Sequence, residues 1–313
     1  MVIGDTLHAE PWAFDLHTGK QKMRLHPITG KPDRWQFARG GHCGCPAASP
    51  NCLFFRSNCL GYYDLSGDYG MMHFGSLRPG CWINFIVAGG LLLMPEASTG
   101  CMCAFPHMCS IVLTPTEKTK GWAMYSAPGP MTPVRRLAIN FGAPGDRNDA
   151  AGKLWLGYPR PQLPYGRLVL PLKIDVSFYP GGRFVRGNSI YTSITGTDDP
   201  WLFASGCSGV KSLTIPVIGE GEKPAVYTVR LGFVDTENDK TGRRIFDIKL
   251  QNELVEENFD IIQTAGAPNK AVVKEFHGVK IKDNLKIEFA SKTKTPILNC
   301  VEITREQQIT AKK

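Results

Sequence analysis

Strand-like runs of alternating apolar and polar residues recur along the chain, and turn residues separate them at intervals of roughly 8–15 residues. The runs are rich in β-branched and aromatic side chains, and the first part of the chain has almost no apolar pattern of helical period. The 33 Gly and 23 Pro residues exceed average usage, as expected of a turn-rich β protein. Together these features predict an all-β fold.

The two halves differ in the length of these runs. In the second half they cover residues 135–142, 167–178, 212–216, 225–233, 244–250, 271–276, 285–290 and 297–303. Such a series indicates two facing sheets, a β-sandwich. The first half has shorter runs at 2–3, 7–9, 12–16, 53–56, 61–65, 82–87, 91–94 and 110–114, which predict short strands and hairpins.

A connector rich in Pro, Thr and Lys lies at residues 115–133. We place a domain boundary near residue 125 within it, because such composition interrupts regular structure. The expected organisation is a Cys-rich domain at 1–125, a sandwich at 126–305 and a polar, frayed tail at 306–313.

The formal net charge of +8 does not by itself indicate nucleic-acid binding. The lysines of the last third recur among acidic residues, and alternating signs are typical of a solvated face. No apolar run reaches the 18 or so residues that a membrane helix needs. We therefore expect no nucleic-acid partner and no membrane span.

Two neighbouring segments carry a family resemblance. The strands YTVRLGF (227–233) and GRRIFDI (242–248) resemble the pair that marks malectin-like domains, and residues 258–261, 271–276 and 296–303 continue the pattern in order. The resemblance implies a jelly-roll sandwich that binds glucose-type oligosaccharides through aromatic residues of its loops. It also implies a structural role for Phe246 and Asp247, as a core ring and a turn-facing carboxylate.

Sugar recognition needs flat aromatic faces that stack on pyranose C–H surfaces, and carboxylates or amides that accept hydroxyl hydrogen bonds. The first part of the sandwich supplies both kinds of side chain. The candidates are Trp155, Tyr158, Tyr165, Tyr179, Tyr191, Trp201, Asp146, Asp198 and Asp199. Each single aromatic could equally pack in the core or at its rim.

The N-terminal half carries a second resemblance. WAFDLHTGK (12–20) looks like the blade ending of PQQ-like propellers, and RPGCWIN (78–84) and PEASTGCMC (95–103) resemble the last blades of large PQQ-like proteins of planctomycete-type bacteria. About 115 residues hold only two or three blades, too few to close a ring. The resemblance therefore implies the end of a longer protein, partnered by missing blades or another subunit, in the periplasm or outside the cell.

Cysteines concentrate in the first half, with eight of the ten between Cys43 and Cys109. Three interpretations stay open: disulfides, free thiols, or a metal site with soft ligands that suit Cu, Zn or Fe. The candidate metal ligands are His42, Cys43, Cys45, Cys81, Cys101, Cys103 and His107. In the sandwich, Cys207 and Cys300 are predicted to form a disulfide.

No nucleophile elbow, phosphate-binding Gly loop or HExxH motif is present. The segment 235–242 alternates oxygen donors but lacks the terminal Glu of an EF-hand, so we interpret it as a polar hairpin loop. The leading hypothesis is a non-catalytic carbohydrate-binding module on a Cys-rich propeller-like scaffold. The alternative is a metal- or redox-cofactor-binding module belonging to a quinoprotein-like oxidoreductase.

Overall fold

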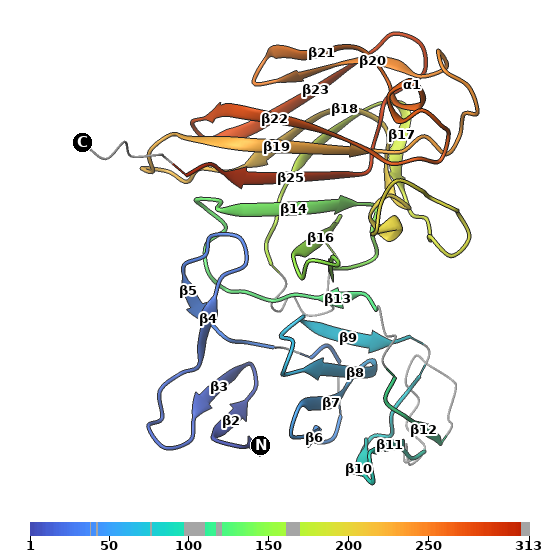
Figure 1. The fold of residues 1–313 in the computed structure, drawn as a ribbon. Helices are drawn as coiled ribbons and strands as arrows, with labels where there is room; N and C mark the ends of the chain where they lie inside the picture. The colour runs from blue at the N-terminus through green and yellow to red at the C-terminus, as the bar shows by residue number, and fades with distance from the viewer. Residues whose placement is uncertain are drawn as a thin grey trace.

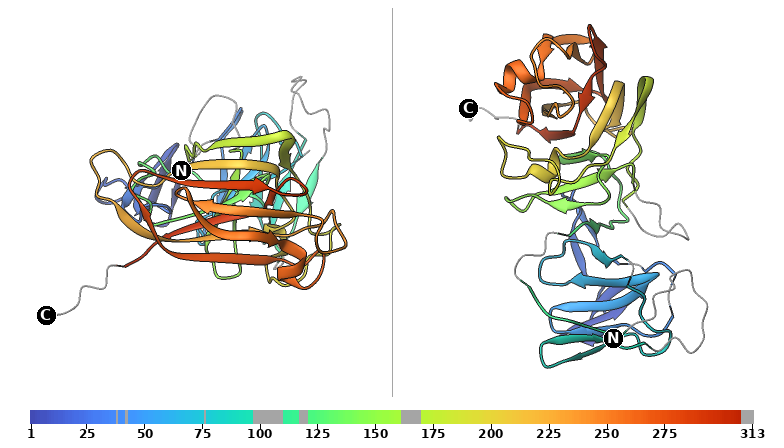
Figure 2. Two further views of the ribbon diagram at one scale, coloured as in Figure 1. Left: turned by 90° about the horizontal axis from the view of Figure 1, so that it is seen from above. Right: turned by 90° about the vertical axis from the view of Figure 1, so that its right-hand side faces the viewer.

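The computed structural model describes residues 1–37, 39–41, 43–75, 77–96, 110–116, 121–160 and 170–307. Two bodies lie one above the other in Figure 1: a lower body of small sheets formed by the N-terminal half, and an upper sandwich formed by the C-terminal half. Figure 2 shows the same separation from the side. The prediction of an all-β fold with a β-sandwich is confirmed.

In the residues that the structure describes, the lower body contains four antiparallel sheets. Their strands are β1 (Val2–Ile3), β2 (Thr6–Ala9), β3 (Trp12–Asp15), β4 (Met23–Leu25), β5 (Pro32–Arg34), β6 (Ala47–Ser49), β7 (Cys52–Ser57), β8 (Cys59–Asp64), β9 (Met71–Phe74), β10 (Ile86–Ala88), β11 (Leu91–Met94), β12 (Ile111–Leu113) and β13 (Ala123–Met124). The largest sheet has the order β13-β9-β8-β7-β6, so the connector itself contributes its edge strand. Whether these sheets are propeller blades stays a prediction, as does the boundary near residue 125.

The upper body contains two sheets and two short helical segments. Its elements are β14 (Arg136–Phe141), β15 (Arg147–Asn148), β16 (Leu154–Tyr158), β17 (Asp175–Val185), η1 (Pro200–Leu202), β18 (Gly206–Pro216), β19 (Ala225–Phe233), β20 (Ile245–Leu250), β21 (Glu253–Asp260), α1 (Ile261–Ala265), β22 (Val272–Ile281), β23 (Asn284–Ser291), β24 (Ile297–Leu298) and β25 (Cys300–Arg305). The first sheet, here the β14 sheet, has the order β15-β16-β14-β25-β19-β22. The second, the β18 sheet, has the order β17-β18-β23-β20-β21, with β24 paired to β18.

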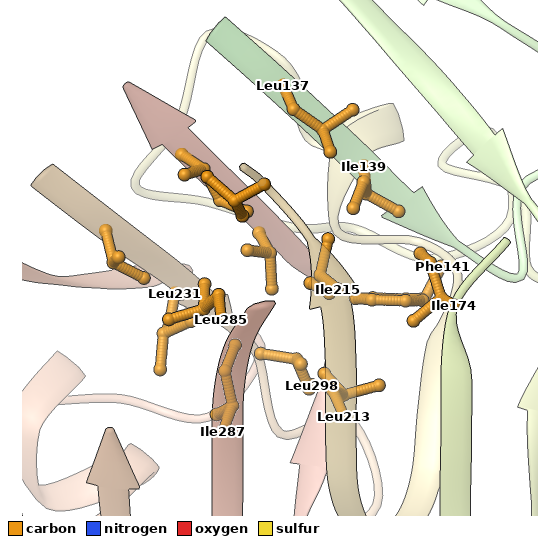
Figure 3. Packing of buried hydrophobic residues seen from close by; sticks show 14 of the residues in the cluster. Leu137, Ile139, Phe141, Ile174, Leu213, Ile215, Leu231, Leu285, Ile287 and Leu298 are labelled. Carbon is orange, nitrogen blue, oxygen red and sulfur yellow. The ribbon is translucent and has the colours of Figure 1, made fainter. Parts of the chain in front are cut away.

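The core of the sandwich lies between these two sheets. Along β23, Leu285, Ile287 and Phe289 are buried while the residues between them are exposed, which is the period-two pattern of a strand with one face covered. Figure 3 shows side chains of both sheets meeting there, with Leu137 of the β14 sheet and Ile215 of the β18 sheet in one cluster.

The segment 235–242 is not a hairpin loop, because β19 and β20 belong to different sheets and the chain crosses from one to the other. Asp235 is buried at the start of the crossing. Its carboxylate accepts a hydrogen bond from Arg244 Nε at 2.9 Å, and Arg244 Nη2 also donates to Glu237 at 2.7 Å. The carboxylates of Asp235 and Glu237 thus accept hydrogen bonds from a buried arginine, so they already have partners within the protein.

The predicted disulfide between Cys207 and Cys300 is wrong, since both are free thiols. Cys207 lies on β18 and points into the core between the sheets, whereas Cys300 lies on β25 and packs in a separate cluster. The Cys207 thiol therefore lies on the inner side of the β14 sheet, and the Cys300 thiol lies on its outer side. Burial raises the pKa of both thiols.

The two bodies contact each other through backbone and side chains. The carbonyl of Ile28 in the lower body accepts hydrogen bonds from the backbone N–H groups of Arg135 (2.8 Å) and Arg136 (3.0 Å), and the Ile28 side chain joins the sandwich core. Among the described residues, no helix has the length and apolarity that a membrane span requires.

Candidate functional site

A short segment after β17 covers the outer face of the β14 sheet. On β14, Leu137 and Ile139 point into the core, so Ala138 between them points outward. The apolar residues on this outer face form one cluster, made of Ala138, Trp155, Ile194, Trp201, Leu202, Phe203, Val234 and Cys300. Two of the predicted site residues, Trp155 and Trp201, thus come together from separate parts of the sequence.

Both indoles are buried rather than open, with Trp155 7% and Trp201 5% exposed. Each indole N–H donates to a carboxylate, Trp155 to Asp149 at 3.0 Å and Trp201 to Asp199 at 2.8 Å. Their faces are therefore fixed parts of the wall of the site, and Asp199 is the residue that orients Trp201.

Asn299 anchors the chain that carries Trp201. Its amide nitrogen donates to the carbonyls of Phe203 and Ser205, both at 2.8 Å, and its amide oxygen accepts from Val234 N at 2.8 Å. All three bonds are buried, so this amide holds the segment after η1 against the end of β19.

Arg147 and Trp122 are functional candidates that the sequence did not identify. The guanidinium of Arg147 lies 4.7 Å from the ring centre of Trp201 and 5.4 Å from that of Trp122, and the two indoles meet edge to face. Burial lowers the pKa of Arg147, and the nearby carboxylate of Asp199 opposes that shift. A cation held between two aromatic rings presents fixed N–H donors beside flat apolar surface.

A groove of about 490 Å³ opens beside this arrangement. Trp122, Arg147 and Trp201 line it together with residues of the loop 186–192. On that loop Tyr191 is 87% exposed, so its phenol ring reaches solvent. The groove therefore combines an open aromatic ring with a guanidinium and with the amide of Asn188.

The other predicted sugar-binding residues lie elsewhere. Tyr158 donates its hydroxyl to the carbonyl of Ile174 at 2.8 Å and so ties β16 to the residue before β17. Tyr179 donates to the carbonyl of Phe289 at 2.9 Å and so ties β17 to β23. Asp146 is fully buried and pairs with Arg160. Asp198 is exposed, whereas Asp199, Asp146 and Asp149 line a second hollow of about 290 Å³ that shares Arg147 and Trp201 with the groove. Tyr165 lies outside the described residues.

Phe246 is a fully buried core ring, as expected. Asp247 lies within β20 rather than at a turn. Its carboxylate accepts a hydrogen bond from Asn258 N of the neighbouring strand at 2.7 Å, and it pairs with Lys292. Both residues have structural partners.

The predicted metal ligands are only partly described. Cys43 and Cys45 are exposed free thiols, and Cys81 is a buried free thiol whose sulfur accepts a hydrogen bond from Arg56 at 3.3 Å. His42, Cys101, Cys103 and His107 lie outside the described residues. Within the described part of the chain, no three His, Cys, Asp or Glu side chains come close enough to hold a metal.

The malectin domain model matches residues 173–308. The sandwich thus contains a malectin domain, and β14, β15 and β16 of the β14 sheet precede the matched residues. Arg147, Trp122 and Trp155 lie in this preceding part. No curated protein matches the chain.

Several solved structures are similar to parts of the chain. A Bacteroides uniformis beta-glucuronidase is 21% identical over 55% of this chain and 18% of its own, with a TM-score of 0.42. The plant receptor-like kinase ANX2 is 14% identical over 55% of this chain and 48% of its own, with a TM-score of 0.43. Bacteroides uniformis beta-glucuronidase 2 is 15% identical over 86% of this chain and 29% of its own, with a TM-score of 0.43. The chain spans less than half the length of each.

Proposed function

We propose that this chain is a non-catalytic carbohydrate-binding module whose glycan lies in the groove between Trp201 and the loop 186–192. The lower body is then a scaffold, and the chain works outside the cell or in the periplasm, as part of a longer protein or with a partner subunit. The malectin domain at residues 173–308 supports a sugar as the ligand class.

One observation carries the choice of site: Tyr191, 87% exposed, lines the same groove as the guanidinium of Arg147. A pyranose ring needs a flat aromatic surface for its C–H face and directed polar groups for its hydroxyls. Tyr191 supplies the first. Arg147 and Asn188 supply the second, and the indoles of Trp122 and Trp201 hold Arg147 in place.

The substitution that tests this site is Tyr191→Ala, because the buried indoles Trp155 and Trp201 also support the fold. We expect glucan binding to weaken roughly tenfold, the equivalent of about 1.4 kcal/mol, which is the order expected for loss of an aromatic contact. Binding would be measured by calorimetry with glucose-type oligosaccharides selected on a glycan array.

Ile190→Ala is the matched control. Ile190 is the neighbouring residue and is 82% exposed, but it does not line the groove. Its substitution should leave affinity unchanged. Equal affinities of wild type and Tyr191→Ala would reject this site, and an array on which no glycan binds would reject the function.

A further inference from the structure

The groove beside Tyr191 is one of four hollows that adjoin along the outer side of the β14 sheet. It shares Arg147 and Trp201 with a second hollow of about 290 Å³. The second hollow shares Asp149 and Asp199 with a third of about 390 Å³. Successive hollows thus have wall residues in common.

The fourth hollow, about 790 Å³ in volume, is the largest, and it shares Lys153 and Glu302 with the third. It lies where β14 begins and β25 ends. In Figure 1 this end of β14 and β25 is at the left, and the segment that follows β17 lies at the opposite end of these strands, at the right. The four hollows thus extend from the Tyr191 loop to the opposite end of the strands of the β14 sheet.

The fourth hollow is rich in cations. Arg135, Lys153 and Arg305 line it and are exposed, and none has an ion-pair partner among the residues that the structure describes. Arg136 lines it too, but its Nε donates to Glu302 at 2.7 Å.

The two acidic residues of this hollow are already engaged by protein groups. Glu302 pairs with Arg136 and also approaches Arg230 at 3.6 Å. Glu306 accepts hydrogen bonds from Thr228 Oγ1 at 2.9 Å and from Gly278 N at 2.8 Å. The remaining charge at this end is therefore positive, and guanidinium groups bind carboxylate and sulfate oxygens well.

We propose that the four hollows form one path for an anionic polysaccharide, whose carboxylate or sulfate groups contact Arg135, Lys153 and Arg305 while a sugar ring occupies the Tyr191 groove. This inference rests on the proposed function and adds the ligand's charge and length. We expect affinity to rise once the oligosaccharide is long enough to reach from the Tyr191 groove to the fourth hollow.

The test compares charged polymers with neutral counterparts that have the same sugar backbone. Polygalacturonate is measured against its fully methyl-esterified form, and dextran sulfate against dextran, with the whole chain and calorimetry at low salt. Wild type should bind the charged member of a pair about tenfold more tightly or better, and added salt should reduce that ratio. The pair with the larger ratio identifies carboxylate or sulfate as the group recognised.

Arg135→Ala with Arg305→Ala should bring the ratio close to one while binding of the neutral polymer is retained. Lys249→Ala with Lys286→Ala is the matched control, since both lysines are exposed on the β18 sheet, away from the hollows. The control pair should keep the wild-type ratio.

A ratio of one in wild type, or a ratio that survives the arginine substitutions, overturns the anionic ligand but leaves the sugar module intact. Equally tight binding of a single-stranded oligodeoxynucleotide, lost in the same double variant, overturns the assignment to a glycan and indicates a general polyanion surface. If no polymer of either charge binds, the proposed function and this inference fail together.

Discussion

Asp235 illustrates how a residue that looks like a loop ligand in the sequence becomes part of the core. It is 1% exposed and faces the equally buried Arg244. Burial acts to raise the pKa of this carboxyl, but hydrogen bonds from Asn238 and Arg244 outweigh it and lower the pKa below its ordinary 3.8. The ion pair therefore stabilises the charged form of Asp235 in the folded state.

Asp235→Asn should lower the free energy of unfolding at pH 7 by about 3 kcal/mol, since a buried arginine loses its charged partner. Because the folded pKa is the lower one, wild type gains this stability above pH 3.8 and loses it as the pH falls through the folded pKa. Urea unfolding at pH 7 and pH 3 should show the difference between wild type and variant shrinking in acid.

Asp239→Asn is the control for this substitution, because Asp239 is exposed in the same segment. It should change stability little at either pH. A gap between wild type and Asp235→Asn that is as large at pH 3 as at pH 7 would contradict the linkage.

Some single residues of the candidate site could be predicted from the sequence and others could not. Tyr191, Trp201 and Asp199 were candidates because aromatic and acidic residues cluster in their segment. Trp122 and Arg147 were missed. Trp122 lies in the connector, and its contact with Arg147 and Trp201 exists only after distant segments pack together.

At the scale of strands, the close approach of β19 and β25 depends on Gly232. A Cβ at this position would overlap the sulfur of Cys300, its partner in the ladder, and would lie 3.0 Å from Phe203 Cε1. A side chain larger than hydrogen fits here only if the side chain of Cys300 or Phe203, or the backbone, shifts.

Gly232→Ala should therefore destabilise the protein by about 1–3 kcal/mol, the usual cost of overpacking. Adding Cys300→Ala to this variant should recover part of the loss, because it removes the sulfur. Gly75→Ala is the control, since a Cβ there meets nothing within 4 Å. Thermal unfolding would contradict the argument if Gly232→Ala melted like wild type, or if Cys300→Ala gave no recovery.

The strands that the sequence predicted best are those with one clearly buried face. Residues 225–233 form β19 as expected, because its alternation reflects burial on the core side. β21, at Glu253–Asp260, was not predicted as a strand, since this edge strand carries few buried apolar residues. The run at 82–87 is a strand only from Ile86 onward.

At the scale of the whole molecule, the sequence did not predict which residues of the two bodies contact each other. Their contacts join residues one hundred or more positions apart, such as Arg24 and Ser126 (102) or Lys31 and Glu222 (191), and no local pattern marks such pairs. Arg24 of β4 is the clearest example. It donates to both carboxylate oxygens of Asp68, at 2.9 and 3.1 Å, and to the carbonyl of Ser126 beyond the lower sheet, and its guanidinium lies 4.4 Å from the ring centre of Tyr125.

Because Arg24 is buried and joins the lower body to the chain that leads into the sandwich, Arg24→Met should uncouple the two bodies. The Asp68 carboxylate is 33% exposed, so loss of this pair and of the hydrogen bond to Ser126 should cost about 1.5–3 kcal/mol, the range for hydrogen bonds to charged groups. Calorimetry should then resolve a lower-temperature transition of the N-terminal body, while the sandwich transition stays near its original temperature.

Lys31→Met provides the comparison, because Lys31 and Glu222 also bridge the two bodies, but as an exposed pair 3.4 Å apart. Exposed pairs contribute about 1 kcal/mol or less, so this variant should unfold like wild type. If Arg24→Met and Lys31→Met gave the same unfolding profile, the buried arginine would not be what couples the bodies.

Contact between the bodies also matters for binding, since Tyr69 and Met72 of the lower body line the same hollow as Trp201. The Arg24 variant should therefore bind long glycans less tightly than Lys31→Met does.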